Sequence, residues 1–233
     1  MKSSSNCRRY FGMFHFFLIA WAWFFFNPII AMAGNEPLPL NELLVKMQEA
    51  YEQTKDYQAN FVQEVTVKAL QRTEREEGIV YFKNPYLIRW DYERPKAKKL
   101  VISAKKAWLY IPEDRVVYVQ NVDGFLRSKL AVRFLSGIGK LQEDFTMQYA
   151  PSEMHSLDAN YLLVLIPKER HEATGKLYLS VDRATLQVVG CRFFDSYGNE
   201  TKIKLVKTKV NQGLSDTLFI FRPPQGVDLV ELP

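Results

Sequence analysis

The chain has 233 residues, and its 31 Lys and Arg against 26 Asp and Glu give a formal net charge of +5. Without the N-terminal segment described next the charge is only about +2, and with no basic tract and no interleaved aromatic pattern this gives no reason to expect a nucleic-acid-binding protein. About two hundred residues are enough to form one domain with its own hydrophobic core.

The N-terminal segment has the features of a secretory signal peptide. Residues 1–10 carry three basic side chains and no acidic one, an apolar run covers 11–30, and an A-x-A sequence follows. We expect cleavage between Ala33 and Gly34, which removes residues 1–33 and leaves an exported protein. An uncleaved membrane anchor is the alternative, because the apolar run could just span a bilayer.

Removal of this segment changes both the charge and the cysteine content. The mature chain, residues 34–233, keeps 28 basic and 26 acidic residues, so its net charge falls to about +2. Cys7 is lost with the signal peptide, so Cys191 stands alone and no intramolecular disulfide can form. Cys7 also precedes the apolar run, where it is not placed for lipidation. We therefore expect a soluble mature protein.

The mature chain begins with a predicted helix. Apolar residues recur at helical spacing from Leu40 to Tyr51, with Asn41 as the predicted N-cap, and the helix is expected to reach about Asp56. From Gln58 the period of the pattern changes from 3.6 to 2, which predicts a strand.

Further alternating runs, bounded by turn residues, predict a succession of antiparallel strands. They cover 78–83, 87–92, 98–103, 107–111, 115–120, 145–149, 161–166, 175–181, 187–195, 201–207 and 217–221. Segment 128–141 interrupts them with helical spacing, and Gly137 and Gly139 are expected to split it into two short helices.

These elements predict a mainly β fold with some α-helix. So many strands must nearly close on themselves, because open sheet edges are a liability, and the helices at 40–56 and 128–141 must each bury an apolar face. An incomplete antiparallel β-barrel of about eleven strands with a lid of two or three helices meets both requirements. A β-sandwich is the alternative. No linker or internal repeat divides residues 34–233, so we expect a single domain.

No combination of residues indicates a catalytic or metal site. His155 and His171 are isolated in polar segments, and no second ligand stands at metal-binding spacing. Ser136 lacks the context of a nucleophile elbow. Cys191 lies among apolar residues of a predicted strand, where burial is expected. We therefore expect a non-enzymatic protein without cofactor or metal, with a hydrolase as an open alternative.

Aromatic residues concentrate on the predicted strands, where Ile88, Trp90 and Tyr92 share one face. An ordinary packed core is one interpretation, and the lining of a ligand cavity inside an unfilled barrel is the other. The candidate residues for a lipid-binding cavity and its lid are Phe61, Val65, Ile79, Tyr81, Ile88, Trp90, Tyr92, Trp108, Tyr110, Leu130, Phe134 and Ile138.

Six short motifs stand in order along the chain. They are Phe61-Val62-Gln63, Gly78, and the segments 89–95 (RWDYERP), 108–112 (WLYIP), 195–203 (DSYGNETKI) and 219–227 (FIFRPPQGV). Each motif is weak alone, but together and behind a signal peptide they resemble the outer-membrane lipoprotein carrier protein family, known as LolA. The resemblance covers about 57–230.

This resemblance implies a periplasmic chaperone with an apolar cavity for the acyl chains of lipoproteins. Members of the family receive lipoproteins from an inner-membrane ABC transporter and pass them to a receptor at the outer membrane. We expect a monomer. Two alternatives stay open: a related carrier for another amphiphile, and a periplasmic regulatory sensor that binds a protein partner.

The sequence departs from the family pattern at three places. Asn84 precedes Pro85 where the family usually has a basic residue that helps to hold the lid, and Ile88 stands where an aromatic residue is common. The segment 104–106 (AKK) replaces an Asp-Gly turn. These differences concern lid closure more than the fold.

Overall fold

A computed structural model describes residues 37–84, 87–122, 142, 145–151, 160–168 and 177–232. The chain divides into the units Met1–Glu36 and Pro37–Pro233, and all described residues belong to the second. Several predicted features lie outside the described residues: the signal peptide with its cleavage site at Ala33 and Gly34, the helical segment 128–141 with Leu130, Phe134 and Ile138, and both His155 and His171.

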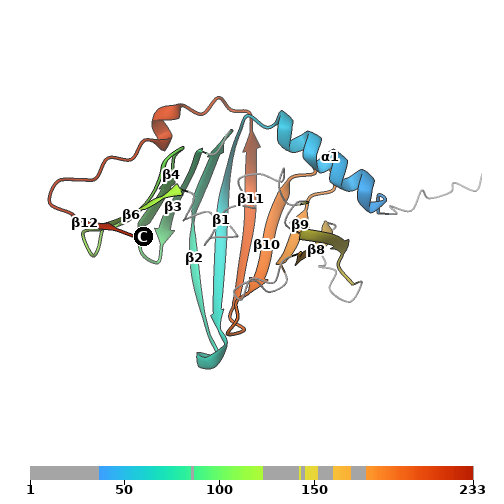
Figure 1. The fold of residues 1–233 in the computed structure, drawn as a ribbon, viewed down its shortest axis with the longest axis horizontal. Helices are drawn as coiled ribbons and strands as arrows, with labels where there is room; N and C mark the ends of the chain where they lie inside the picture. Colours follow the sequence, from blue (N-terminus) through green and yellow to red (C-terminus); the bar gives the residue numbers. More distant parts are fainter. Residues whose placement is uncertain are drawn as a thin grey trace, which may run out of the picture. The chain divides into compact units, whose positions relative to one another are not determined.

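The described residues form one α-helix and twelve strands (Figure 1). The helix is α1 (Leu40–Gln53), and the short 3-10 turns are η1 (Lys68–Leu70) and η4 (Asp216–Phe219). The strands are β1 (Asp56–Val67), β2 (Arg72–Lys83), β3 (Leu87–Arg94), β4 (Lys98–Ile102), β5 (Lys106–Ile111), β6 (Val116–Asn121), β7 (Phe145–Tyr149), β8 (Tyr161–Pro167), β9 (Leu177–Val181), β10 (Val188–Phe194), β11 (Glu200–Val210) and β12 (Asp228–Glu231).

All twelve strands belong to one sheet, in the order β12-β6-β5-β4-β3-β2-β1-β11-β10-β9-β8-β7. Neighbouring strands are antiparallel except β12 and β6, which are parallel. The sheet is open, with β12 and β7 as its end strands. The prediction of a mainly β fold is confirmed. The predicted lid of two or three helices is not, since α1 is the single α-helix of the described residues.

Two local predictions were wrong. The N-cap of α1 is Pro39, whose carbonyl accepts from the Leu43 N–H, and Asn41 lies inside the first turn. The segment predicted as a strand at 217–221 instead contains η4. The hydroxyl of Ser215 accepts a hydrogen bond from the Thr217 N–H, and such local bonds from a side chain to the backbone compete with strand pairing.

Strand alternation gives the sheet two different faces. We call the face that packs against α1 the core face; Leu43, Leu44 and Met47 of α1 are buried against it. Its buried side chains include Tyr57, Ala59, Phe61, Val80, Phe82, Ile88, Trp90, Leu100, Ile102, Ala107, Leu163, Leu165, Leu177, Leu179, Cys191, Ile203 and Leu205. This large apolar surface is the core of the described unit.

The C-terminal segment, residues 211–232, covers part of the opposite face, which we call the outer face. It runs from the end of β11 to β12 (Figure 1). Arg89 of β3 donates to the Leu218 carbonyl at 2.9 Å, and the Phe221 ring packs against Trp108 at 5.8 Å and Tyr110 at 5.9 Å. Strands β3 and β5 therefore turn one face toward the core and the other toward this segment.

Candidate functional site

Three aromatic rings meet at the centre of the core face. The ring centroid of Phe61 in β1 lies 4.6 Å from that of Trp90 and 4.9 Å from that of Tyr92, both in β3. The Trp90 and Tyr92 rings are stacked, with their centroids 6.1 Å apart. Trp90 and Phe61 are almost fully buried. Such tilted and edge-to-face pairs add about 0.5–1.5 kcal/mol each beyond the burial of their area.

Gly78 makes this contact possible, because β2 lies between β1 and β3. Gly78 is paired with Phe61 on one side and with Tyr92 on the other, so the two rings meet above a position without a side chain. A Cβ atom at Gly78 would lie 1.9 Å from the Asp91 carbonyl oxygen and 3.0 Å from the Phe61 ring. Glycine is required here by close approach.

Two polar atoms are buried in this apolar surface. The Trp90 Nε1 and the Tyr57 hydroxyl have no hydrogen-bond partner within the described part of the chain. Burial raises the pKa of Tyr57, so the hydroxyl stays protonated and can act as a donor. An unmade hydrogen bond on a buried donor costs about 1–3 kcal/mol. Both atoms could therefore be satisfied by an acceptor on a bound molecule.

The apolar surface is bordered by four half-buried polar side chains, Gln63, Glu76, Tyr92 and Lys98, which we call the polar margin. Lys98 Nζ lies 2.6 Å from Glu76 Oε1 and 4.2 Å from the centre of the Tyr92 ring. Gln63 donates to Glu76 Oε2 at 3.0 Å, and the Tyr92 hydroxyl donates to Gln63 Oε1 at 3.5 Å. Burial, and to a lesser degree the Glu76 charge, raises the pKa of Tyr92.

The structure brings together five of the twelve residues predicted to line a cavity. Phe61, Ile88, Trp90 and Tyr92 pack on the core face, and Val65 follows Phe61 and Gln63 at period 2 onto the same face. Whether these residues bind lipid is untested, so that role stays a prediction.

Four other predicted residues, Ile79, Tyr81, Trp108 and Tyr110, lie on the outer face, so the structure does not bring them together with these five. The residues next to them in each strand point toward the core instead. These are Gly78, Val80 and Phe82 in β2, and Ala107 and Leu109 in β5. A shift of one residue in strand register reverses every side chain. The outward aromatics of β5 instead pack under Phe221.

Sequence reasoning missed several core-face positions, including Tyr57, Val80, Phe82 and every member of the polar margin except Tyr92. The sequence contained part of the information needed to place the polar margin. Gln63 follows Phe61 by two residues and Glu76 precedes Gly78 by two, so each lies on the same face of its strand as that neighbour. The pairing of Gln63 with Glu76 across two strands was needed to bring them together.

Asn84, the departure before Pro85, has a structural role of its own. Its amide donates to the Thr54 carbonyl at 3.3 Å, and its backbone N–H donates to the Lys55 carbonyl at 2.9 Å. The neighbouring Lys83 donates to the Leu214 carbonyl at 2.7 Å on the outer face. Asn84 therefore attaches the end of β2 to the link between α1 and β1.

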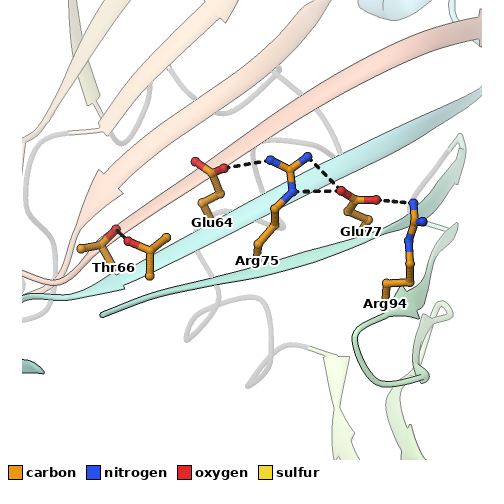
Figure 2. A network of polar contacts seen from close by, with 6 residues as sticks. Glu64, Thr66, Arg75, Glu77 and Arg94 are labelled. Carbon is orange, nitrogen blue, oxygen red and sulfur yellow. Dashed lines mark hydrogen bonds and ion pairs between the residues drawn. The ribbon is translucent and has the colours of Figure 1, made fainter. Parts of the chain in front are cut away.

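The outer face carries a hollow of about 750 Å³ over β1 and β8 to β11, lined by residues that include Val62, Glu64, Arg75, Leu162, Tyr178 and Arg192. Beside it, Figure 2 shows Arg75 between Glu64 and Glu77, with Arg94 on the far side of Glu77. Arg75 and Arg94 are largely exposed, and ion pairs of such side chains contribute little to stability. Charged side chains thus stand among the apolar lining of this hollow, whereas the buried side chains of the core face are apolar.

The chemistry of the described residues offers no metal or thiol centre. No group of three or more His, Cys, Asp or Glu that could hold a metal occurs among them. Cys191 is buried as expected, and desolvation raises its pKa to about 12, which keeps the thiol protonated. None of the helices in the described ranges has the length and apolar character to span a membrane.

The fold and this face define a class of protein: a mainly β chain with an open sheet, one of whose faces is a broad apolar surface with a polar margin. The family model described as "Outer membrane lipoprotein carrier protein LolA" matches residues 52–222. The chain therefore belongs to the LolA family of lipoprotein carriers, as its six motifs had indicated.

Curated relatives agree with this assignment. An "Outer-membrane lipoprotein carrier protein" of Legionella pneumophila is 31% identical over 173 residues, which cover 74% of this chain and 82% of the relative. A protein of the same name from Methylococcus capsulatus is 26% identical over 186 residues, 80% of this chain and 86% of the relative.

Solved structures show a similar fold. An uncharacterized conserved protein from Thermus thermophilus superimposes with a TM-score of 0.54 at 15% identity, covering 82% of this chain and 98% of that one. At this identity the likeness supports the architecture alone.

Proposed function

We propose that this chain is a periplasmic, non-enzymatic carrier that binds the acyl chains of lipoproteins on its core face and transfers them from the inner to the outer membrane. The observation that carries the proposal is the family match over residues 52–222, which contains β1 to β11 and so the whole core face. The N-terminal sequence supports export by a signal peptide that is cut between Ala33 and Gly34. We propose that the remaining residues, 34–233, form one monomeric domain.

The proposed binding surface is the aromatic group on the core face, with Phe61, Trp90 and Tyr92 at its centre and Val65 and Ile88 beside them. Leu130, Phe134 and Ile138 are proposed to complete it as a helical lid. Its proposed partners are the ABC transporter that releases lipoproteins at the inner membrane and the receptor that accepts them at the outer membrane.

Energetics limit how completely the cargo is covered. Burial of one methylene contributes ~0.8 kcal/mol, so three chains with about 45 methylenes would gain roughly 35 kcal/mol if fully enclosed. Non-covalent affinities reach a limit near −18 to −21 kcal/mol, and a carrier must also release its cargo. We infer that the acyl chains are covered only in part, so that a partner can accept them without an energy source.

A carrier for another amphiphile is the second candidate, and the residues near the end of β2 favour it. Asn84 replaces the basic residue of the family, and its hydrogen bonds are made to Thr54 and Lys55 near the end of α1. A different closing arrangement is compatible with a different cargo.

Isolation of the exported protein with its bound material tests these proposals. The tagged chain is produced in a Gram-negative host, purified from the periplasm without detergent, and analysed by mass spectrometry. Triacylated peptide supports the first proposal, and another amphiphile supports the second. A protein partner without lipid indicates a regulatory sensor. An empty protein that turns over an ester substrate would refute both carrier proposals.

A further inference from the structure

The core face changes from apolar to polar within one row of residues. Phe61, Gly78 and Tyr92 are aligned across β1, β2 and β3, and the next inward pair along β1 and β2 is Gln63 with Glu76. Successive inward residues of a strand are about 7 Å apart. In the other direction, Tyr57 and Phe82 form an apolar row, and Phe82 contacts Tyr51 of α1 at 6.1 Å.

The polar margin retains donor capacity beyond its internal bonds. Both carboxylate oxygens of Glu76 are used, one by Lys98 and the other by Gln63. The Lys98 ammonium has three N–H donors, and Glu76 takes one of them. Its side chain is 28% exposed, so it is held in place while still reachable.

A second donor lies one inward row away. Trp90 precedes Tyr92 at period 2, and its buried Nε1 lacks a partner among the described residues. Lys98 at the polar margin and Trp90 in the adjacent row thus provide cationic and neutral N–H donors on this apolar surface. A molecule with apolar chains joined at a group of carbonyl oxygens matches this arrangement.

We propose that the polar margin, with Trp90, binds the carbonyl-rich junction of the cargo, where ester groups attach the acyl chains to glycerol. Lys98 donates to one ester carbonyl and Trp90 Nε1 to another, and the chains extend from there toward Tyr57 and α1. The inference rests on the proposed carrier function and adds an orientation and a chemical selectivity to it.

The matched comparison uses two ion pairs on opposite faces of the sheet. Glu76→Gln with Lys98→Met removes the pair on the core face. Glu64→Gln with Arg75→Met removes the pair on the outer face shown in Figure 2, and Arg75 is the direct neighbour of Glu76 in β2. The two double variants make the same kind of change, but only the first touches the proposed site.

Binding is measured with the purified mature protein and two synthetic lipopeptides that differ only in their diacyl ester or dialkyl ether linkages. The wild type is expected to bind the ester form about tenfold more tightly, as for one hydrogen bond to a charged donor. The core-face variant is expected to lose this preference and the outer-face variant to keep it. Trp90→Phe is expected to lose part of it.

The outcomes separate the two proposals. If the wild type binds neither lipopeptide, the carrier function is refuted. If it binds both equally, or if the core-face variant keeps the preference, the function stands and the junction site is refuted.

A crosslinking measurement uses the wild type alone, so its result does not depend on whether a variant folds. A photoreactive group on the residue after the lipidated cysteine is expected to label β1 near Val65, and labelling near Tyr57 would refute the orientation.

Discussion

Phe61 and Tyr92 lie in edge-to-face contact, with ring centroids 4.9 Å apart, although a whole strand separates their backbones. The contact exists because β2 presents Gly78 at the level of both residues. A single position without a side chain thus links β1 and β3 and forms the centre of the candidate binding surface.

Gly78→Ala is expected to lower the free energy of unfolding by about 2–3 kcal/mol, as for other overpacked sites. The new Cβ would lie 1.9 Å from a backbone carbonyl oxygen of Asp91, which cannot move aside as a flexible side chain would. Urea denaturation followed by circular dichroism measures the loss. The control is Gly213→Ala, where no atom lies within 4 Å and only the positive φ of +73° opposes alanine, at a cost of about 1 kcal/mol. Equal losses for the two variants would contradict the close-approach argument.

The two tryptophans of the mature chain report on the two faces separately. Trp90 lies on the core face and Trp108 under Phe221 on the outer face. Lipopeptides with brominated acyl chains are expected to quench the fluorescence of the Trp108→Phe variant, in which Trp90 remains. They should leave Trp90→Phe nearly unquenched. Quenching of Trp108 alone would place the acyl chains on the outer face and contradict the proposed site.

The sequence predicted strands well because a period of two is a local property. Each of the eleven strands expected between Gln58 and Lys207 has a counterpart in the sheet. Which face of a strand becomes buried depends on distant residues. Trp108 and Tyr110 are covered by Phe221, more than a hundred residues later, so their direction could not be inferred from β5 alone.

The other three residues of the polar margin were missed for a related reason. Gln63, Glu76 and Lys98 come from three strands, and each alone is typical of a solvated strand position. Their half-buried contacts depend on the register of β1, β2 and β4 relative to one another. Sequence alternation gives the face of a residue only when the pairing is known.

Phe219→Ala is expected to destabilise the fold by about 3–5 kcal/mol, because this ring is only 2% exposed where the C-terminal segment meets the outer face. Its neighbour provides the control, since Ile220 is 58% exposed and Ile220→Ala should change stability by about 0.5 kcal/mol or less. Denaturant titration of both variants measures the difference. A loss of stability in Phe219→Ala as small as that in Ile220→Ala would show that the segment contributes little to stability.

Cys191 is expected to make stability fall as the solution becomes alkaline. The unfolded thiol ionises near pH 8.5, whereas burial raises the folded pKa to about 12, so the unfolded state loses its proton first. The stabilising contribution is complete below the unfolded pKa and is lost progressively as the pH rises toward the folded pKa. Between pH 8.5 and 10, the wild type should lose about 1–2 kcal/mol more than Cys191→Ala.

The same burial predicts slow chemistry at this thiol. Alkylation of Cys191 by iodoacetamide at pH 8 should be slow in the native protein and fast in urea, because only the exposed thiolate reacts. The pH window stops at 10 because burial also raises the pKa values of Tyr57 and Tyr92, which add a similar loss at higher pH. Parallel stability curves for the wild type and Cys191→Ala over this window would mean that Cys191 is more accessible to water than its packing indicates.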